Sequence, residues 1–548
     1  MATLAEPLSS SAGPTDIPLL EETIGDCLRR TAADNADGEA VVVRHQGARL
    51  TYAELVAAAD RVARALLAAG LGVGDRVGIW APSCVEWLLL QHGSARAGVI
   101  LVCINPAYRS HELAYVLQQS GMRLLVSAES FKSSDYRAMV EQVRPGAPEL
   151  ARVVYLGAGW DDFLSAGDAV PAEAVRARSA GLRPTDPINI QYTSGTTGFP
   201  KGATLSHRNI LNNGREIARI LAYSVGDRIC VPVPFYHCFG MVIGNLAALS
   251  AGACVVVPAP SFEPEATLAA VQEERCTSLY GVPTMFIAEL ALPSFASWDL
   301  SSLRTGVMAG SPCPAEVMKR VITEMHMEEV TICYGMTETS PVSTQTRADD
   351  DLERRVATVG RVHPHIEVKV VDPATGQTLP RGAPGELCTR GYSVMLGYWR
   401  DPDRTAEAID AEGFMHTGDL ATMDTEGYLA IVGRIKDLVI RGGENIYPRE
   451  VEEFLYTHPA ILDAQVVGVP DERYGEELCA WVQLREGSEL TAAELQEWCR
   501  GRLAHYKVPR YVRFTDAFPM TVTGKVQKYL MRATSIAELD LAPGATGR

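Results

Sequence analysis

Residues 192–202 read YTSGTTGFPKG, a run of glycine and hydroxyl-bearing residues that ends in Lys201 and Gly202. Glycine lets the backbone approach an anion and present its N–H groups, hydroxyls add donors, and the lysine adds positive charge. The run lies between an apolar segment, 188–192, that predicts a strand and a helix expected to begin near His207. A Walker-type loop has glycine directly before its lysine, where this chain has Pro200. The stretch therefore predicts a phosphate-binding loop of another kind, with a flexible surface turn as the alternative.

Short apolar strands alternate with helices on both sides of this loop. The capping pattern Thr51-x-x-Glu54 opens a helix that we expect to end near Gly70, and further helices are expected at 85–97 and 112–119. The expected strands are 76–80, 99–104, 123–127, 188–192, 229–233, 277–282, 306–310 and 331–334. Such alternation implies right-handed crossovers and parallel sheets.

The pattern changes twice in the second half of the chain. After about Ala357 it becomes strand-and-turn, as at 366–371 and 385–390. After Arg434 a compact α+β unit is expected, with helices at 449–458 and 491–506 and strands at 465–469 and 479–484. We therefore expect an α/β fold: a large N-terminal domain of parallel αβαβα-type subdomains with a β-rich subdomain, and a small α+β C-terminal domain joined by a hinge.

The expected domain boundaries follow from these changes. Residues 1–20 are interpreted as a mobile N-terminus, 21–435 as the N-terminal domain, 436–535 as a mobile C-terminal domain and 536–548 as a tail.

Composition places the chain among globular proteins and narrows its partners. Of its 548 residues 47% are hydrophobic and 21% charged, which excludes a disordered or fibrous protein. A formal net charge of -17 argues against a general nucleic-acid binder, because such proteins need a surplus of Lys and Arg.

Location is predicted from the cysteines and the apolar segments. The 12 cysteines include no C-x-x-C pair, and the first residues lack the apolar core of a secretory leader, so we expect a reduced, cytoplasmic protein. Residues 229–262 carry no charged side chain, but Pro232, Pro234 and Asn245 interrupt them. We interpret this stretch as strand, loop, helix, turn and strand, with no transmembrane segment.

Two more segments have residues suited to a metal nucleotide. Residues 334–338, YGMTE, place an aromatic face, a hydroxyl and a carboxylate at a strand end. Taken alone, Glu338 would be a helix N-terminal residue. Gly310-Ser311-Pro312 follows another expected strand, where a plain turn is the alternative.

Four short segments in the last third of the chain complete the set. In 416–419, HTGD, and 433–437, GRIKD, a carboxylate could accept two vicinal hydroxyls and an arginine could reach the same sugar. Residues 441–445, RGGEN, have two glycines that would leave a narrow passage open, or would make a hairpin turn. Residues 523–525 are Thr-Gly-Lys, and a lysine there would otherwise be a solvated charge.

These segments occur in the order in which they occur in the adenylate-forming superfamily, which the chain resembles over nearly its whole length. The superfamily includes acyl-CoA synthetases, luciferases and peptide-synthetase adenylation domains, and the chain is most similar to the medium-chain acyl-CoA synthetase branch. The resemblance implies an AMP-forming acid–thiol ligase that uses ATP, Mg²⁺ and coenzyme A.

The resemblance also implies roles for individual residues. It implies that Lys525 reaches the acyl carboxylate and α-phosphate, that Glu338 holds Mg²⁺, and that Thr196 and His237 take part in catalysis. The implied nucleotide-binding and CoA-binding residues are Thr193, Ser194, Gly195, Thr196, Thr197, Gly198, Lys201, Gly310, Ser311, Pro312, Tyr334, Gly335, Thr337, Asp419, Arg434, Lys436, Gly442, Gly443 and Lys525. Lys436 matches the position about which the family's small domain rotates.

The acid is expected to bind in an apolar pocket. Residues 235–240, FYHCFG, match the family segment that gates the carboxylate site. The expected lining is His237, Phe239, Gly240, Val307, Met308, Ala309 and Gly310, without a fixed cation for a second carboxylate. This indicates a medium-chain fatty acid or a similar apolar acid.

Other functions share the nucleotide motifs. A stand-alone adenylation enzyme would load an acyl or aryl acid onto a carrier protein in place of CoA. A luciferase-like oxygenase would take up oxygen, and a non-catalytic nucleotide-binding protein would leave ATP unconsumed. A homodimer is left open as the assembly.

Overall fold

The computed structural model describes residues 7–193, 200–311, 313–520 and 526–541. These residues divide into two compact units. Unit 1 comprises the first ten residues, Lys369–Cys388 and Thr417–Arg548, and unit 2 comprises Ser11–Val368 and Thr389–His416. These two units are distinguished by how densely their residues pack and not by any motion. The hinge expected at Lys436 therefore stays a prediction.

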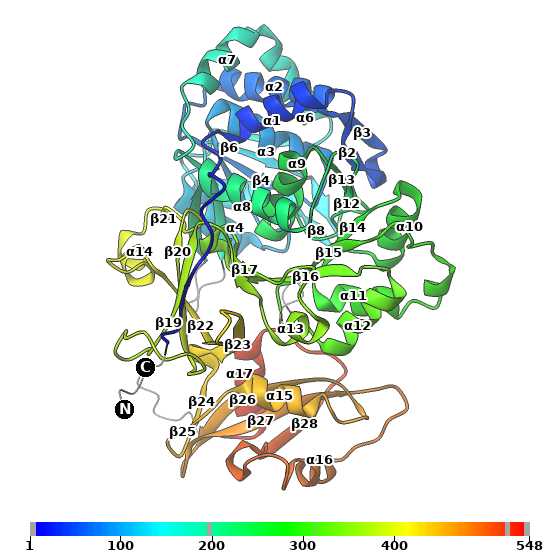
Figure 1. The fold of residues 1–548 in the computed structure, drawn as a ribbon. Helices are drawn as coiled ribbons and strands as arrows, with labels where there is room; N and C mark the ends of the chain where they lie inside the picture. The colour runs from blue at the N-terminus through cyan, green and yellow to red at the C-terminus, as the bar shows by residue number, and fades with distance from the viewer. Residues whose placement is uncertain (1–6, 194–199, 312, 521–525, 542–548) are drawn as a thin grey trace, which may run out of the picture. The chain divides into compact units, whose positions relative to one another are not determined.

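Unit 2 contains the two large sheets (Figure 1). The order of the first is β21 (Gly397–Tyr398), β11 (Lys201–Ser206), β10 (Pro187–Thr193), β5 (Ile100–Cys103), β4 (Arg76–Trp80), β6 (Leu124–Ser127) and β9 (Arg152–Tyr155). The order of the second is β18 (Arg361–Val362), β17 (Val342–Gln345), β16 (Glu329–Gly335), β15 (Thr305–Ala309), β14 (Ser278–Gly281), β12 (Arg228–Cys230), β13 (Cys254–Val257), β2 (Glu39–Val43) and β3 (Ala48–Thr51). Strands β4, β5, β6 and β9 are parallel, as are β12 to β16, which confirms the predicted α/β class.

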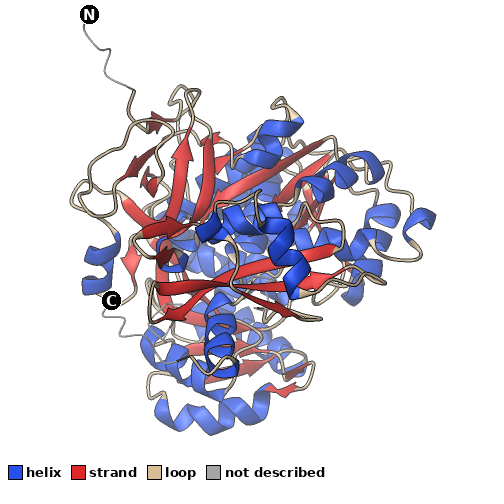
Figure 2. Ribbon diagram, turned by 90° about the horizontal axis from the view of Figure 1, so that it is seen from below, coloured by secondary structure: helices blue, strands red, loops and turns tan. Residues whose placement is uncertain are grey.

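Helices connect and cover these strands, a pattern that can be followed in Figure 2. They are α1 (Ile24–Asp34), α2 (Tyr52–Ala68), α3 (Val85–Ala97), α4 (Ser110–Ser120), α5 (Tyr136–Val143), α6 (Ala158–Ala166), α7 (Ala172–Ala180), α8 (His207–Ile220), α9 (Ala247–Ala251), α10 (Pro264–Glu274), α11 (Pro283–Leu290), α12 (Ala315–Glu324), α13 (Leu352–Ala357) and α14 (Pro402–Ala408). The capping box of Thr51 and Glu54 opens α2, and a capping box of Ser206 and Asn209 opens α8 at the predicted place. A short pair, β7 (Ser130–Phe131) and β8 (Ser134–Asp135), lies before α5.

The core of unit 2 has two parts that meet the nine-stranded sheet from opposite faces. One core contains Ile79 and Ile190 of the first sheet, Val307 of the second and the helices between them. The other contains Met308 and apolar residues of α10, α11 and α12. Burial of these side chains is worth about 25 cal/mol for each Å² of apolar surface removed from water.

The strands expected in the β-rich part and the small α+β part form two further sheets, and the boundaries of unit 1 fall within four strands of the first of them. One sheet has the order β1 (Ser10–Ala12), β19 (Ile366–Val371), β20 (Gly385–Gly391), β22 (Met415–Met423) and β23 (Leu429–Arg434). The other has the order β25 (Glu444–Ile446), β24 (Val439–Arg441), β27 (Gly475–Leu484) and β26 (Ile461–Asp471), with β28 (Tyr511–Phe514) on β27. Its helices are α15 (Pro448–Leu455), α16 (Ala492–Cys499) and α17 (Lys528–Glu538).

Three local expectations differ from the structure. The helix expected at 491–506 ends at Cys499, because Arg500 is extended and Gly501 has a φ of +74°, and a 3-10 turn at His505–Lys507 follows. The first twenty residues include β1, and the Ser9 N–H donates to the Leu379 carbonyl at 2.7 Å. The loop 192–202 leads into a strand, β11, before the helix.

The structure also bears on the expectations about the cysteines and about the uncharged stretch 229–262. All twelve cysteines are buried and unlinked, as expected of core thiols. Residues 229–262 form a strand, a loop, helical turns and a strand. Among the residues that the structure describes, no helix combines the length and the apolar character needed to cross a membrane.

Candidate active site

The phosphate loop joins two neighbouring strands. Thr193, the last residue of β10, is paired with Lys201, the first residue of β11, in an antiparallel hairpin. The loop between them includes Ser194, Gly195, Thr196, Thr197 and Gly198, which lie outside the described residues. The described ends of the loop are therefore a hydroxyl and an ammonium group on paired backbone positions.

Glu338 lies next to the first of these ends. It belongs to the 3-10 turn Thr337–Thr339, which is separated from the end of β16 by one residue, and it is only 4% exposed. Its Oε1 accepts hydrogen bonds from the Thr193 hydroxyl at 3.2 Å and from the Tyr398 hydroxyl at 2.9 Å. The Met395 N–H donates to the Glu338 carbonyl at 2.9 Å. A residue that local sequence would assign to a helix N-terminus is thus held against the phosphate loop.

The adenine-binding segments predicted from the sequence lie at the ends of two adjacent strands. Strands β15 and β16 are parallel, with Ala309 opposite Cys333, so Gly310 and Tyr334 follow at the same edge of the sheet. At Gly335 a Cβ atom would lie 1.8 Å from the Pro341 carbonyl oxygen, which requires glycine there. Thr337 is buried next to Glu338, Ser311 is half-buried, and Pro312 lies outside the described residues.

His237 lies in the loop that follows β12, in the same parallel group of strands. Its Nδ1 accepts the backbone N–H of Phe239 at 3.2 Å, which fixes the orientation of the imidazole ring. Phe239 and Gly240 begin a buried π-helical stretch, Phe239–Leu246. The Phe239 ring lies 5.8 Å from the ring of Tyr280 on β14, so the surroundings of His237 are apolar and aromatic.

One expected pocket residue faces the wrong way. Successive side chains of a strand point to opposite faces. Val307 and Ala309 belong to the core on the side of Phe239, whereas Met308 packs into the other core. Met308 therefore does not share a face with Val307 and Ala309, and the expectation that all three line one pocket is corrected for it.

The predicted ribose residues form a pair in unit 1. Asp419 on β22 lies opposite Arg434 on β23, and the Arg434 Nε donates to the Asp419 Oδ1 at 2.9 Å. Asp419 is 8% exposed, whereas the Arg434 side chain is 51% exposed. The two residues named together from the sequence are brought together by the structure.

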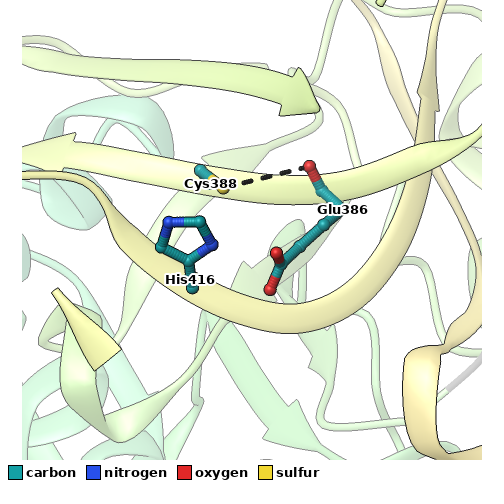
Figure 3. Close-up of side chains that lie close together, drawn as sticks. All are labelled: Glu386, Cys388 and His416. Atoms are coloured by element: carbon teal, nitrogen blue, oxygen red, sulfur yellow. Dashed lines mark hydrogen bonds between the residues drawn. The ribbon is translucent and has the colours of Figure 1, made fainter. Parts of the chain in front are cut away.

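The turn before Asp419 is held by β20. Glu386 and Cys388 lie two residues apart on this strand, and the Cys388 thiol points to the Glu386 carbonyl (Figure 3). The Glu386 carboxylate accepts the N–H of Gly418 at 3.0 Å, and the Thr417 hydroxyl donates to the Leu387 carbonyl at 2.6 Å. Glu386 was not singled out from the sequence, because a carboxylate in a β-strand carries no local signal of this contact.

Lys436, Gly442 and Gly443 lie in turns of unit 1. Lys436 is in the 3-10 turn Ile435–Asp437, where burial and then the Arg434 charge lower the pKa of its ammonium group. Gly442 and Gly443 form the turn between β24 and β25, with φ values of +61° and +88°. The segment is thus a hairpin turn, and its role toward CoA stays a prediction. Lys525 lies outside the described residues.

Sequence reasoning missed Tyr398. This side chain donates to Glu338 and its ring lies 4.9 Å from the Lys201 Nζ, so it contacts the Lys201 end of the phosphate loop and the carboxylate beside the Thr193 end. The tyrosine lies in Gly397-Tyr398-Trp399, where an aromatic pair after glycine indicates a turn or strand end and nothing more. Only the pairing of β21 with β11 brings it to the site.

A glycine-rich segment between two paired strands, beside a buried carboxylate, is suited to bind a phosphate group and its metal ion. Residues 28–399 match the family model of the AMP-binding enzyme, and residues 450–525 match that of the AMP-binding enzyme C-terminal domain. The chain therefore belongs to the AMP-binding enzyme family.

Individual relatives are similar over almost the whole chain. The putative acyl-CoA synthetase YngI of Bacillus subtilis is 49% identical over 544 residues, which are 96% of this chain and 99% of the relative. The mitochondrial medium-chain acyl-CoA ligase ACSF2 of Danio rerio is 45% identical, with 96% of this chain and 91% of the relative covered.

Solved structures share the fold. ATP-bound MatB from Rhodopseudomonas palustris superposes with a TM-score of 0.81 at 32% identity, covering 93% of this chain and 99% of that one. The anthranilate CoA ligase AuaEII, in complex with anthranoyl-AMP, gives a TM-score of 0.84 at 26% identity, covering 96% and 99%.

Proposed function

We propose that this enzyme is an ATP-dependent acid–CoA ligase. It activates a carboxylic acid as acyl-AMP with release of pyrophosphate, and then transfers the acyl group to CoA to give acyl-CoA and AMP. The observation that carries the proposal is the buried Glu338 carboxylate, which Thr193 and Tyr398 hold at the phosphate loop. The names of the relatives, acyl-CoA synthetase and medium-chain acyl-CoA ligase, support the same reaction.

The first step joins an anion to a polyanion. A carboxylate oxygen of the acid attacks the α-phosphorus of ATP, and the bond from that phosphorus to the bridging oxygen breaks, so pyrophosphate leaves with the electron pair. Lys201 at the end of the loop and Lys525 offer positive charge to the phosphates and to the developing negative charge. The protein needs no covalent nucleophile, because the acid is itself the nucleophile.

Glu338 suits a divalent cation. The hydroxyls of Thr193 and Tyr398 both donate to Oε1, and no residue in the described ranges donates to Oε2. Mg²⁺ prefers oxygen ligands and is usually bound by one or two carboxylates together with the phosphates of a substrate. The Oε2 of Glu338 could serve as such a ligand. When bound, Mg²⁺ would offset the negative charge of the phosphates.

The second step uses the mixed anhydride. The CoA thiolate attacks the acyl carbon, the bond from this carbon to the phosphate oxygen breaks, and AMP leaves. We assign the passage for the pantetheine arm to the turn of Gly442 and Gly443, where no side chain would obstruct a thiol. Asp419 and Arg434 are assigned to the ribose, because a carboxylate accepts two vicinal hydroxyls.

For the acid we propose a medium-chain fatty acid or a similar apolar acid. Phe239, Val307 and Ala309 are buried in one core, and the backbone N–H of Phe239 donates to His237. An apolar pocket with a few polar groups at its mouth binds an alkyl or aryl chain by the area that it removes from water. One methylene more or less is worth about 1–3 kcal/mol in such a pocket, so a graded preference for chain length is expected.

A panel of carboxylic acids tests the function. AMP release is measured with ATP, Mg²⁺ and each acid, with and without CoA, and the thioester is identified by mass spectrometry. Multiple turnovers are expected only with CoA, with the highest rates for apolar acids of intermediate length. Turnover that requires a phosphopantetheinyl carrier protein would replace this proposal by carrier loading, and no AMP with any acid would overturn both.

A further inference from the structure

We propose that Tyr398 is a positioning residue for Glu338, which fixes the metal-binding carboxylate and couples it to the phosphate loop. This inference rests on the proposed function, because Glu338 is assigned to Mg²⁺ there. Tyr398 touches no substrate in this proposal and acts through the carboxylate.

The contact between the two side chains is direct and protected from water. The Tyr398 hydroxyl lies 2.9 Å from the Glu338 Oε1, and the residues are 8% and 4% exposed. A hydrogen bond to an ionised carboxylate is roughly twice as strong as a neutral one, and burial spares it from competition with water. Together with the Thr193 hydroxyl at 3.2 Å, it places two donors on one oxygen and leaves the other for a cation.

The phenol is suited to this role because it remains a donor. The ordinary pKa of a tyrosine hydroxyl is about 10. The hydroxyl therefore keeps its proton throughout the physiological range. A neutral donor also leaves the charge of the carboxylate intact, whereas an arginine at this place would compete with the metal ion.

The backbone of Tyr398 ties the same residue to the phosphate loop. In the pairing of β21 with β11, Tyr398 lies opposite Ala203, and the next residue, Trp399, donates its N–H to the Gly202 carbonyl at 2.7 Å. The Lys201 Nζ lies 4.9 Å from the centre of the Tyr398 ring, which favours the cation by its quadrupole. One side chain thus contacts the end of the phosphate loop and the carboxylate that faces it.

The test compares Tyr398→Phe with a matched control, Tyr392→Phe. Phenylalanine keeps the ring beneath Lys201 and removes only the hydroxyl. Tyr392 is also buried and lies six positions earlier, but its hydroxyl accepts from Asn213 and is not bonded to Glu338. Binding of Mn²⁺ in the presence of ATP is measured by electron paramagnetic resonance, and binding of ATP without metal by calorimetry.

Partners of a metal ligand typically contribute 10- to 100-fold to metal affinity. We therefore expect Tyr398→Phe to weaken Mn²⁺ binding about 10-fold, with metal-free ATP binding unchanged, and Tyr392→Phe to change neither. The half-saturating Mg²⁺ concentration in pyrophosphate exchange should rise by the same factor. Equal Mn²⁺ affinity for Tyr398→Phe and the wild type would overturn the proposal.

A second comparison separates positioning from general support of the fold. In a Glu338→Gln background the carboxylate is gone, so adding Tyr398→Phe should weaken Mn²⁺ binding no further. Additive losses in the double variant would show that Tyr398 acts by another route and would sink the inference. Failure of the wild type to release AMP with any acid and CoA would instead count against the proposed function.

Discussion

Two carboxylates of this enzyme, Glu338 in unit 2 and Asp419 in unit 1, are almost equally buried but are held in opposite ways. Glu338 accepts hydrogen bonds from two neutral hydroxyls, whereas Asp419 is paired with the guanidinium of Arg434. Neutral donors orient a carboxylate and leave its charge for a cation, while an arginine neutralises it. The partners therefore distinguish a carboxylate suited to a metal ion from one suited to the hydroxyls of a sugar.

The largest effect is expected at Lys525, because it is assigned a positive charge at the reacting phosphate that neither carboxylate can supply. Lys525→Ala should abolish acid-dependent exchange between ATP and pyrophosphate, because a preorganised charge at the reacting phosphate is worth about 10²- to 10³-fold in rate. Thioester formation from a supplied acyl adenylate should survive. Lys319→Ala, which removes an exposed lysine of α12, serves as the control. Equal loss of both half-reactions in a folded Lys525 variant would contradict this division of labour.

The second largest effect is expected at Gly443 of unit 1, whose assigned role concerns the CoA step and not the adenylation step. Gly443→Leu should spare pyrophosphate exchange and stop CoA consumption, because a side chain would enter the passage assigned to the thiol. The φ of +88° also strains any side chain there, so Gly487→Leu, with a φ of +76° and equally open surroundings, is the matched control. Thioester formation at the wild-type rate in Gly443→Leu would refute the tunnel assignment.

Removing the charge of each carboxylate tests the comparison directly. Glu338→Gln should lower the rate of exchange about 10²-fold, the lower end of the range for one preorganised contact, because the cation loses a charged ligand. Asp419→Asn should raise the KM for ATP about 10-fold with a smaller change in kcat, because an amide oxygen still accepts a hydroxyl while the charged hydrogen bond to Arg434 is lost. Equal effects of the two variants, measured at saturating ATP, would remove the distinction.

The last prediction concerns stability, not activity, and compares a buried histidine with a half-exposed one. Burial lowers the pKa of His207 from 6.5 to about 4. As the pH falls below 6.5, the unfolded chain binds a proton that the folded chain does not, so up to about 3 kcal/mol of stability is lost by pH 4. His207→Gln should reduce this loss in urea unfolding measured at a series of pH values.

The half-exposed His458 of unit 1 provides the control, because burial lowers its pKa to a smaller extent. His458→Gln should leave the acid limb of the stability curve close to that of the wild type. Burial also lowers the pKa values of His92 and His363, so His207 accounts for part of the acid limb. Its contribution is refuted if the two variants have the same slope between pH 6.5 and pH 4.

Much of the fold was predictable because its signals are local. The capping boxes at Thr51 and Ser206 and the short apolar strands depend on residues within a few positions of each other. The end of α16 at Cys499 was not predicted, because apolar residues continue at helical spacing while Gly501 turns the chain away. The participation of Ser10–Ala12 in a sheet likewise depends on a strand more than 350 positions away in the chain.

The sequence by itself determined which residue types stand at the strand ends: the glycines and hydroxyls of 192–202, the carboxylates Glu338 and Asp419, and Arg434. Only the tertiary structure decided which of them meet. The Thr193 hydroxyl reaches Glu338 across 145 positions of the chain, and Tyr398 reaches it across 60. The same holds for Met308, which strand alternation turns away from Val307. Sequence patterns record spacing along one element, whereas the partner of a side chain depends on how distant elements pair and pack.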